Sequence, residues 1–284
     1  MIYEVKEINL DYSKIAVDRI DYIPKLKIFI PNDSEEVSKY TPDRTTVLIL
    51  PGGGYHMTSE REAEPIAFNF LQRGMNAAIL YYSVNPAVFP VSLLETLTAV
   101  KYLRETAQQY HGNKDKIYIC GFSAGGHLAA SAGTLWNKKE AVDYFKDVEQ
   151  VKPNGLILAY PVIINDYDGE VQIHKGSFNN LLGEKCNDKN MLEYLCLDRQ
   201  VSKDTPPTFI WSTFEDTGVP CESSLRFATA LKKNGVPFEL HIYEKGSHGK
   251  STGDLVTNTE TYRLKNWLNE ACDWLLDTRS KYIR

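Results

Sequence analysis

A serine between two glycines is the residue of this sequence best placed to act as a nucleophile. The strand-like run 117–120 leads into Gly121, Ser123 and Gly125, and a small-residue segment follows as far as Leu135. A strand that enters a helix through such a turn leaves the serine exposed, and glycines avoid the clashes that a Cβ would cause there. Glycine and serine are common, so the pentapeptide alone is also compatible with an ordinary turn. A catalytic role requires a base, because a serine hydroxyl is a weak nucleophile unaided.

Two later segments supply an acid and a base in the required chain order of nucleophile, acid and base. The strand-like run 207–214 ends in a turn with two carboxylates, of which Asp216 is the predicted acid and Glu215 the alternative. The alternating run 238–243 ends in a glycine-flanked loop that contains His248, the predicted general base. In acyl transfer, His248 accepts the serine proton and then protonates the leaving alcohol, while the acid orients the imidazole. Water completes this cycle, so we expect no cofactor and no metal.

Three consecutive glycines after another apolar run provide candidate donors for a developing oxyanion. The run 46–50 is followed by one proline and then by the glycine triplet. The backbone N–H groups of Gly53, Gly54 and Ala124 are the predicted oxyanion hole. A flexible loop or a phosphate cradle is the alternative. No Gly-Lys-Ser/Thr follows the triplet, and its spacing is not Gly-x-Gly-x-x-Gly, so nucleotide-binding loops are disfavoured.

Several short motifs stand at the ends of the predicted strands. They are PGGGY (51–55), GFSAGGH (121–127), YPV (160–162), Asp216 with VP (219–220), and SHG (247–249). Together they resemble the α/β-hydrolase esterases related to hormone-sensitive lipase, especially the bacterial acetyl-xylan and sugar-ester branch. The likeness extends from about residue 25 to 280. In that family a histidine usually precedes the glycines, and the proline found here is shared by the sugar-ester and prolyl-oligopeptidase-like members.

The resemblance implies a serine carboxylesterase that hydrolyses short-chain acyl esters through an acyl-enzyme on Ser123. Acetyl groups on sugars or xylo-oligosaccharides are the specific substrates that it implies. One alternative is a serine peptidase of the prolyl-oligopeptidase type, although no propeller-sized segment precedes the motifs in this sequence. The other is a non-catalytic binding protein on the same fold, which would have no need of His248.

Strand and helix patterns alternate along the chain, which predicts an α/β fold with a mostly parallel central sheet covered by helices on both faces. With the resemblance, this is the α/β-hydrolase fold. The expected strands are 26–30, 46–50, 77–82, 117–120, 155–160, 208–212 and 239–243. The expected helices are 61–73, 91–109, 125–135, 223–234 and 259–277.

Length and composition are those of a soluble catalytic domain. The 284 residues are long enough for one sizeable core, and no linker or repeat divides 1–284. No apolar run approaches about 18 residues and no signal-peptide pattern is visible, so we expect a cytoplasmic protein that does not enter a membrane. The five scattered cysteines are expected to be reduced thiols. A net charge of −5 offers no basic face for nucleic acid.

A polar segment at about 165–203 interrupts the alternation and is predicted to form a cap over the site. Its composition differs from that of a lipase lid, which exposes an apolar face to lipid, and it suits a hydrated partner such as an acylated sugar. A solvated surface insertion is the alternative. Tyr55 and Tyr160 follow core strands and are candidate walls of an acyl pocket that would admit only short acyl groups. An exposed aromatic edge of the last helix is a candidate homodimer contact.

The polar stretch after the glycine triplet has two interpretations. Glu60, Arg61 or Glu62 could bond sugar hydroxyls, or Ser59 and Glu62 could form a helix-capping box, which the pattern favours. His127, one turn into the helix after the serine, is expected to be a buried and satisfied histidine. His111 and His174 follow no pattern and indicate no zinc site.

Overall fold

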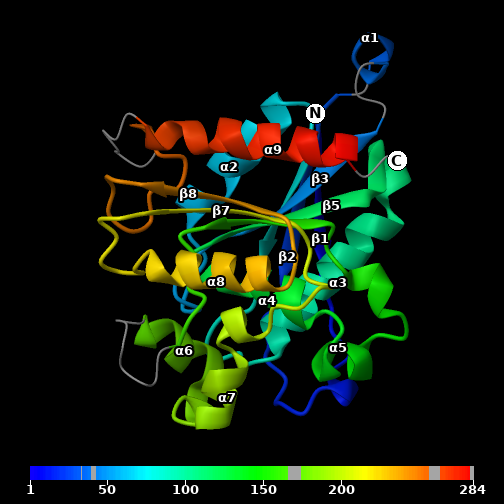
Figure 1. The fold of residues 1–284 in the computed structure, drawn as a ribbon. Coiled ribbons are helices and arrows are strands. Elements are labelled where there is room, and N and C mark those ends of the chain that lie inside the picture. Colours follow the sequence, from blue (N-terminus) through cyan, green and yellow to red (C-terminus); the bar gives the residue numbers. More distant parts are fainter. Residues whose placement is uncertain (33, 40–42, 166–173, 256–262, 282–284) are drawn as a thin grey trace.

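A computed structural model describes residues 1–32, 34–39, 43–165, 174–255 and 263–281. In these residues one sheet has the strand order β1-β2-β4-β3-β5-β6-β7-β8 (Figure 1). The strands are β1 (Ile2–Glu7), β2 (Lys25–Ile30), β3 (Arg44–Leu50), β4 (Asn76–Tyr81), β5 (Gly112–Phe122), β6 (Gly155–Ala159), β7 (Thr208–Thr213) and β8 (Phe238–Tyr243). The β1–β2 and β2–β4 pairs are antiparallel, and all pairs from β4 to β8 are parallel.

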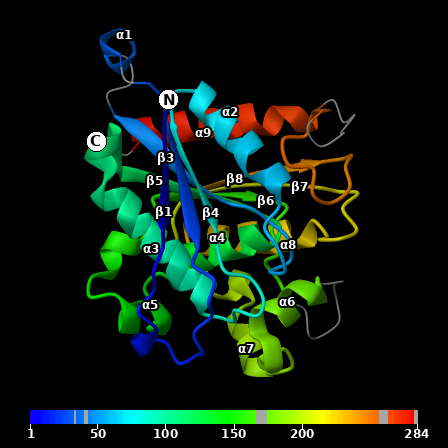
Figure 2. The same ribbon diagram turned by 180° about the vertical axis from the view of Figure 1, so that it is seen from behind.

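Helices cover both faces of this sheet (Figures 1 and 2). On one face lie α2 (Glu64–Gln72) and α9 (Trp267–Lys281), and on the other lie α3 (Val91–Glu105), α4 (Ala124–Leu135) and α8 (Glu222–Lys233). The shorter helices are α1 (Glu35–Ser38), α5 (Lys139–Tyr144), α6 (Lys175–Leu182) and α7 (Lys189–Tyr194). The arrangement confirms the predicted α/β-hydrolase fold class.

The two faces of the sheet have separate hydrophobic cores. Along β3, Leu48 and Leu50 join the core beneath α3, α4 and α8, whereas Val47 and Ile49 join the core beneath α2 and α9. Successive side chains of a strand point to opposite faces, so a strand covered on both sides is apolar throughout. This double burial explains why the core strands are visible as continuous apolar runs in the sequence.

All seven predicted strands exist, with ends shifted by one or two residues except at β5. That strand begins at Gly112, five residues before the predicted start. Its first half is polar, so this part does not show the apolar pattern on which the prediction relied. The sequence pattern does not predict β1, an edge strand in which every residue except Glu4 is exposed.

Three predicted helices have different limits. The helix expected at 61–73 begins at Glu64, because Pro65 lacks the N–H that a longer helix would need and is tolerated only in a first turn. The helix expected at 91–109 ends at Glu105 and is followed by a 3₁₀ turn at Ala107–Tyr110. The helix expected at 259–277 begins at Trp267, after a 3₁₀ turn at Leu264–Asn266, and its predicted start at 259–262 lies outside the described residues.

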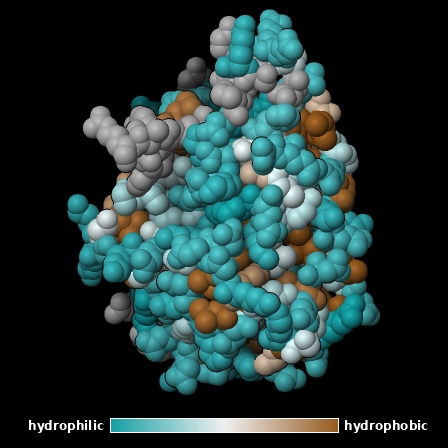
Figure 3. Space-filling view, turned by 90° about the vertical axis from the view of Figure 1, so that its right-hand side faces the viewer, coloured by the Kyte–Doolittle hydropathy of each residue, from teal (hydrophilic) through white to brown (hydrophobic). Residues whose placement is uncertain are grey.

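The face of the molecule shown in Figure 3 is mostly hydrophilic, and its hydrophobic side chains form small separate groups. Scattered apolar side chains of this kind are normal on a protein surface. No helix among the described residues has the length and apolar character needed to span a bilayer.

Candidate active site

The predicted site residues lie at one edge of the sheet, because the four strands that precede them run parallel to one another. The glycine triplet follows β3, Ser123 follows β5, Asp216 lies three residues after β7 and His248 five residues after β8. Parallel strands present their carboxyl ends at a common edge, where ligands of open α/β sheets bind. The topology therefore brings together groups that are up to 196 residues apart in the sequence, from Gly52 to His248.

Ser123 occupies a strained turn that only close packing permits. Its backbone angles are φ 52° and ψ −116°, in a region that non-glycine residues rarely enter. A Cβ at Gly121 would lie 2.2 Å from the Gly125 carbonyl oxygen, and a Cβ at Gly125 would lie 2.1 Å from the Leu50 carbonyl oxygen. The two glycines are therefore required by contacts with the helix α4 and the end of β3.

A continuous hydrogen-bonded chain joins the three predicted catalytic residues. The Ser123 Oγ atom is 2.8 Å from His248 Nε2, and His248 Nδ1 is 2.7 Å from Asp216 Oδ2. The other oxygen of Asp216 accepts the N–H groups of Gly218 and Val219 at 2.9 and 2.8 Å. Because Nδ1–H donates to the carboxylate, Nε2 is left to accept the serine proton. The Asp216 side chain is 1% exposed and that of His248 26% exposed, so the acid is sealed while the base can be reached.

Glu215, the alternative acid, points elsewhere. Its carboxylate bonds Lys245 Nζ at 2.8 Å and the Gly246 N–H at 3.2 Å. These contacts, the lysine first, lower the pKa of Glu215. The structure thus places Asp216, and not Glu215, beside His248.

The glycine loop has the conformation that free backbone donors require. Gly53 and Gly54 have φ angles of 131° and 64°. A Cβ at Gly53 would lie 2.1 Å from the Met57 carbonyl oxygen. No acceptor among the described residues takes the N–H groups of Gly53, Gly54 or Ala124. Ala124 begins α4, whose N-terminal dipole favours negative charge. Within the part of the chain that the structure describes, the three donors of the predicted oxyanion hole are therefore free.

The two tyrosines predicted to line the acyl pocket are each 2% exposed. The Tyr55 hydroxyl lies 2.9 Å from His127 Nδ1, and His127 Nε2 lies 3.0 Å from the Leu195 carbonyl oxygen. Burial lowers the pKa of His127 to about 4, as expected for a buried, satisfied and neutral histidine. The Tyr160 ring packs edge-on against His248 at 5.1 Å between centroids. Contact of these tyrosines with an acyl group stays a prediction.

Glu62 is a site residue whose place the sequence reasoning missed. The predicted capping box is wrong: Ser59 makes no side-chain cap bond, and Glu62 points into the protein. Its side chain is buried and accepts hydrogen bonds from the Gly52 N–H and the Tyr160 hydroxyl, both at 2.7 Å. The sequence signal against the capping box is Pro65, which favours a helix that starts after Glu62.

The described part of the predicted cap, 174–203, docks on the glycine loop. Asn180 Nδ2 on α6 donates to the Gly54 carbonyl oxygen at 2.9 Å. His174 precedes α6, and its Nδ1 lies 2.8 Å from Ser177 Oγ and accepts the Ser177 N–H at 3.3 Å. The proton of a neutral His174 therefore sits on Nε2, which has no partner among the described residues. Its Cε1 lies 3.7 Å from the position that a Cβ on Gly54 would take.

His174 also interacts electrostatically with His248 and Asp216. Burial lowers its pKa first, the nearby His248 lowers it further, and Asp216 acts in the opposite direction. His174 is thus a neutral polar group beside His248. The sequence carried no signal for it, because its neighbours come from distant segments.

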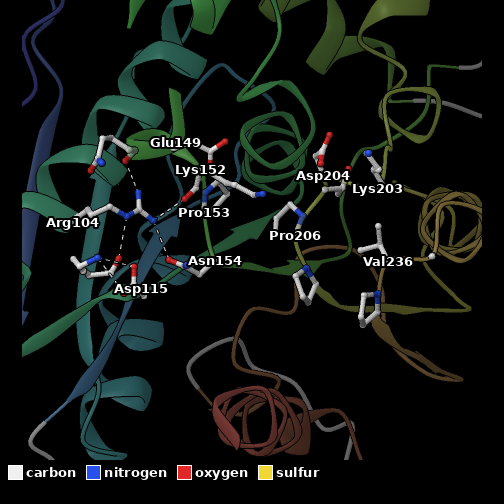
Figure 4. Close-up of a pocket in the computed structure, with 16 residues that line it drawn as sticks. Arg104, Asp115, Glu149, Lys152, Pro153, Asn154, Lys203, Asp204, Pro206 and Val236 are labelled. Carbon is white, nitrogen blue, oxygen red and sulfur yellow. Dashed lines mark hydrogen bonds and ion pairs between the residues drawn. The ribbon is translucent and has the colours of Figure 1, made fainter. Parts of the chain in front are cut away.

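A cavity of about 560 Å³ lies at the opposite, amino-terminal edge of β5 to β8 (Figure 4). Arg104 dominates one end of it and donates to the Lys114 and Lys152 carbonyl oxygens at 3.0 and 2.7 Å and to Asn154 Oδ1 at 3.0 Å. These donors bond to the chain itself and tie α3 to the first half of β5 and to the loop that enters β6. The cavity therefore lies away from Ser123, between segments of the chain that Arg104 joins to one another.

The sheet order and the serine turn after β5 define an α/β-hydrolase. The BD-FAE family model matches residues 26–231. The chain is 35% identical over 253 residues to the endo-1,4-beta-xylanase B of Butyrivibrio fibrisolvens, covering 87% of this chain and 37% of that protein. It is 31% identical over 221 residues to the acetylxylan esterase of Xylanibacter ruminicola, covering 75% of this chain and 42% of that protein.

A solved structure covers almost the whole chain. The acetyl ester-xyloside bifunctional hydrolase of Caldicellulosiruptor lactoaceticus superposes with a TM-score of 0.80 at 32% identity, covering 96% of each chain. The two curated relatives are longer, and this chain spans about two fifths of their length. The chain belongs to the BD-FAE family, within the α/β-hydrolase esterases. The resemblance found in the sequence is therefore confirmed.

Proposed function

We propose that the chain is a serine carboxylesterase that removes short acyl groups, above all acetyl groups on sugars or xylo-oligosaccharides. The observation that carries this proposal is the chain of hydrogen bonds from Ser123 through His248 to Asp216. Ser123 Oγ attacks the ester carbonyl carbon while His248 Nε2 takes its proton. The imidazolium then protonates the leaving alcohol, and a water molecule deprotonated by His248 hydrolyses the acyl-enzyme.

The backbone N–H groups of Gly53, Gly54 and Ala124 are the proposed donors to the oxyanion of the tetrahedral intermediate. Removal of one donor of this kind costs about 3 to 4 kcal/mol of transition-state stabilisation. The N-terminus of α4 adds a positive potential at the same place. Hydrolysis needs no further group, because the attacking and leaving oxygens are both served by His248.

The sugar-ester substrate rests on the named relatives and on the polarity of the cap. An acetylxylan esterase and an acetyl ester-xyloside hydrolase are similar to this chain. His174 Nε2–H is a donor beside His248, and it is our candidate for contact with a hydroxyl group of the sugar. Tyr55 and Tyr160 stay candidates for limiting the acyl group to a short chain. A single domain over 1–284, a cytoplasmic location and a homodimer stay predictions.

The test measures acetate release from acetylated xylo-oligosaccharides beside hydrolysis of p-nitrophenyl acetate, butyrate and octanoate. The wild type is compared with Ser123→Ala and with Ser34→Ala, an exposed serine away from the site. We expect rapid release of acetate that Ser123→Ala reduces by about 10⁴-fold or more and that the control retains. Activity that Ser123→Ala leaves intact would contradict the nucleophile, and activity on p-nitrophenyl acetate alone would contradict the sugar ester.

Two further assays address the alternatives. A fluorophosphonate probe should label wild-type Ser123, and the absence of labelling would favour the non-catalytic binding protein. Hydrolysis of an acyl-proline amide faster than that of an acetate ester would favour the peptidase.

A further inference from the structure

Glu62 joins the oxyanion loop to the opposite wall of the site. One carboxylate oxygen accepts the Gly52 N–H at 2.7 Å, and the other accepts the Tyr160 hydroxyl at 2.7 Å. Gly52 fits tightly at this point. A Cβ added to it would lie 2.7 Å from Glu62 Oε2 and 3.0 Å from Ser123 Cβ. The carboxylate therefore holds the first peptide of the glycine triplet directly behind the nucleophile.

The second half of the connection runs from Tyr160 to the loop of the catalytic histidine. Ser251 lies three residues after His248, and the Tyr160 hydroxyl accepts its N–H at 2.9 Å. Ser251 in turn donates its Oγ to the Arg61 carbonyl oxygen, and its own carbonyl accepts Trp267 Nε1 at 2.8 Å. The Tyr160 ring also lies against the imidazole of His248. A displacement of Glu62 would therefore disturb both the glycine loop and the loop of His248, which lie on either side of Ser123.

The pattern of donors fits an ionised carboxylate. The Gly52 N–H can only donate, and the Tyr160 hydroxyl, which already accepts from Ser251, directs its own proton at Glu62. A protonated Glu62 would have to leave one of these protons without an acceptor. Burial raises the pKa of Glu62, whereas Tyr160, Gly52, His248 and Arg61 all lower it, in that order.

The groups that face Glu62 come from several elements. They are Tyr82 after β4, Cys120 on β5, Tyr160 after β6, His248 after β8, and the neighbouring Arg61. Burial raises the pKa of Tyr82, Cys120 and Tyr160, so these three stay neutral near pH 7. His248 is thus the facing group whose charge changes during the proposed reaction. An anion held next to it favours the imidazolium over the neutral ring.

We propose that Glu62 is a positioning residue that fixes the glycine loop relative to His248 and stabilises the imidazolium formed when Ser123 attacks the ester. The role rests on the proposed esterase function. A buried carboxylate costs free energy of desolvation, and an apolar side chain would fill the same space at a lower cost. A charged side chain is therefore favoured at this position only if its charge contributes to the function of the site.

The test compares Glu62→Gln and Glu62→Asp with Glu64→Gln, a half-exposed carboxylate in the same segment that pairs with Lys27. Glutamine keeps the shape and an acceptor for Gly52 but loses the charge, whereas aspartate keeps the charge. The readouts are kcat and KM for p-nitrophenyl acetate across pH, with circular dichroism to establish folding.

For Glu62→Gln we expect kcat to fall about 10-fold or more with KM changed less than about 3-fold, as for an interaction made mainly in the transition state. The acid limb of its kcat/KM profile should move to lower pH, because the imidazolium loses a neighbouring anion. Glu62→Asp should lower kcat but keep the acid limb of the control. If Glu62→Gln does not fold, Tyr160→Phe takes its place. Tyr160→Phe should lower kcat without raising KM. The control Tyr22→Phe, at an exposed tyrosine, should not lower kcat.

Two results would overturn the proposal. One is a folded Glu62→Gln whose kcat and acid limb match those of Glu64→Gln. The other is an equal loss of kcat in both Glu62 variants with no movement of the acid limb, since this is what a purely structural role gives. Wild-type protein that neither hydrolyses the ester nor reacts with a fluorophosphonate would instead refute the proposed function, and with it this role.

Discussion

Glu95 is a buried carboxyl group on α3 that should make the stability of the protein depend on pH. It is 1% exposed, and its oxygens bond the N–H group of Ser83, at 2.8 Å, and the hydroxyl of the same residue. Burial raises the pKa of Glu95 from 4.5 to about 8, against the opposing effect of the two Ser83 contacts. The folded protein therefore holds a proton near neutral pH that the unfolded chain has released.

The sign and size of the effect follow from linkage. A raised pKa in the folded state gives stability that is fully present below about pH 4.5 and is lost as pH rises to about 8. The difference corresponds to about 5 kcal/mol of unfolding free energy over the whole range, of which about 3 kcal/mol is already lost at pH 7.

The measurement is the unfolding free energy from urea titrations at pH 5, 7 and 9. Wild type is compared with Glu95→Gln, which cannot ionise, and with Glu105→Gln, an exposed glutamate of the same helix. We expect Glu95→Gln to gain about 3 to 5 kcal/mol relative to wild type between pH 5 and pH 9. The control should gain nothing. A difference between wild type and Glu95→Gln that is the same at all three pH values would refute the reasoning.

Two further predictions concern the site. Asp216→Asn should lower kcat for p-nitrophenyl acetate by about 10⁴-fold, because the imidazole loses its orienting acceptor, while Glu215→Gln should stay within a few-fold of wild type. Equal losses in the two variants would contradict the assignment of the acid. His174→Phe should raise KM for acetylated xylo-oligosaccharides about 10-fold, as for one lost hydrogen bond, and leave kcat for p-nitrophenyl acetate unchanged. An equal change for both substrates would show that His174 does not contact the sugar.

Much of the fold could be predicted because the signals that specify it are local. The core strands are buried on both faces and are therefore apolar runs, and the carboxyl ends of parallel strands must meet at one edge. Ser123, Asp216 and His248 each follow such a run, so their neighbourhood follows from topology. The order of nucleophile, acid and base in the chain then restricts which acid and which base can serve.

The parts that could not be predicted depend on contacts between distant segments. The helices of the predicted cap, α6 and α7, have only eight and six residues, so their sequences contain too few turns to establish a helical period. Glu62 stands three residues after a serine, which is the pattern of a local capping box. Its actual partners, Gly52 and Tyr160, are 10 and 98 residues away. In the local sequence only Pro65, which favours a helix start after Glu62, argues against the capping box.

Three non-glycine residues with positive φ show how the sheet holds the site. Tyr55, Ser123 and Tyr160 have φ angles of 55°, 52° and 37°, and they follow β3, β5 and β6. Such conformations cost about 1 to 3 kcal/mol each and persist only where the surroundings enforce them. Here the enforcement is visible. The Ser123 N–H donates to the Ala159 carbonyl at 3.0 Å, and the Tyr160 N–H donates to the Trp211 carbonyl at 2.7 Å.

Each of these two bonds ties a strained residue to the neighbouring strand of the sheet. Ser123 and Tyr160 are therefore held directly by neighbouring strands of the sheet. Glu62 and Ser251 then connect these fixed points to the glycine triplet and to the loop of His248, which Thr213 on β7 also holds through a hydrogen bond to the Gly246 carbonyl oxygen at 2.6 Å. The sheet thus supports Ser123 and Tyr160 directly, and Glu62 links that support to the glycine triplet.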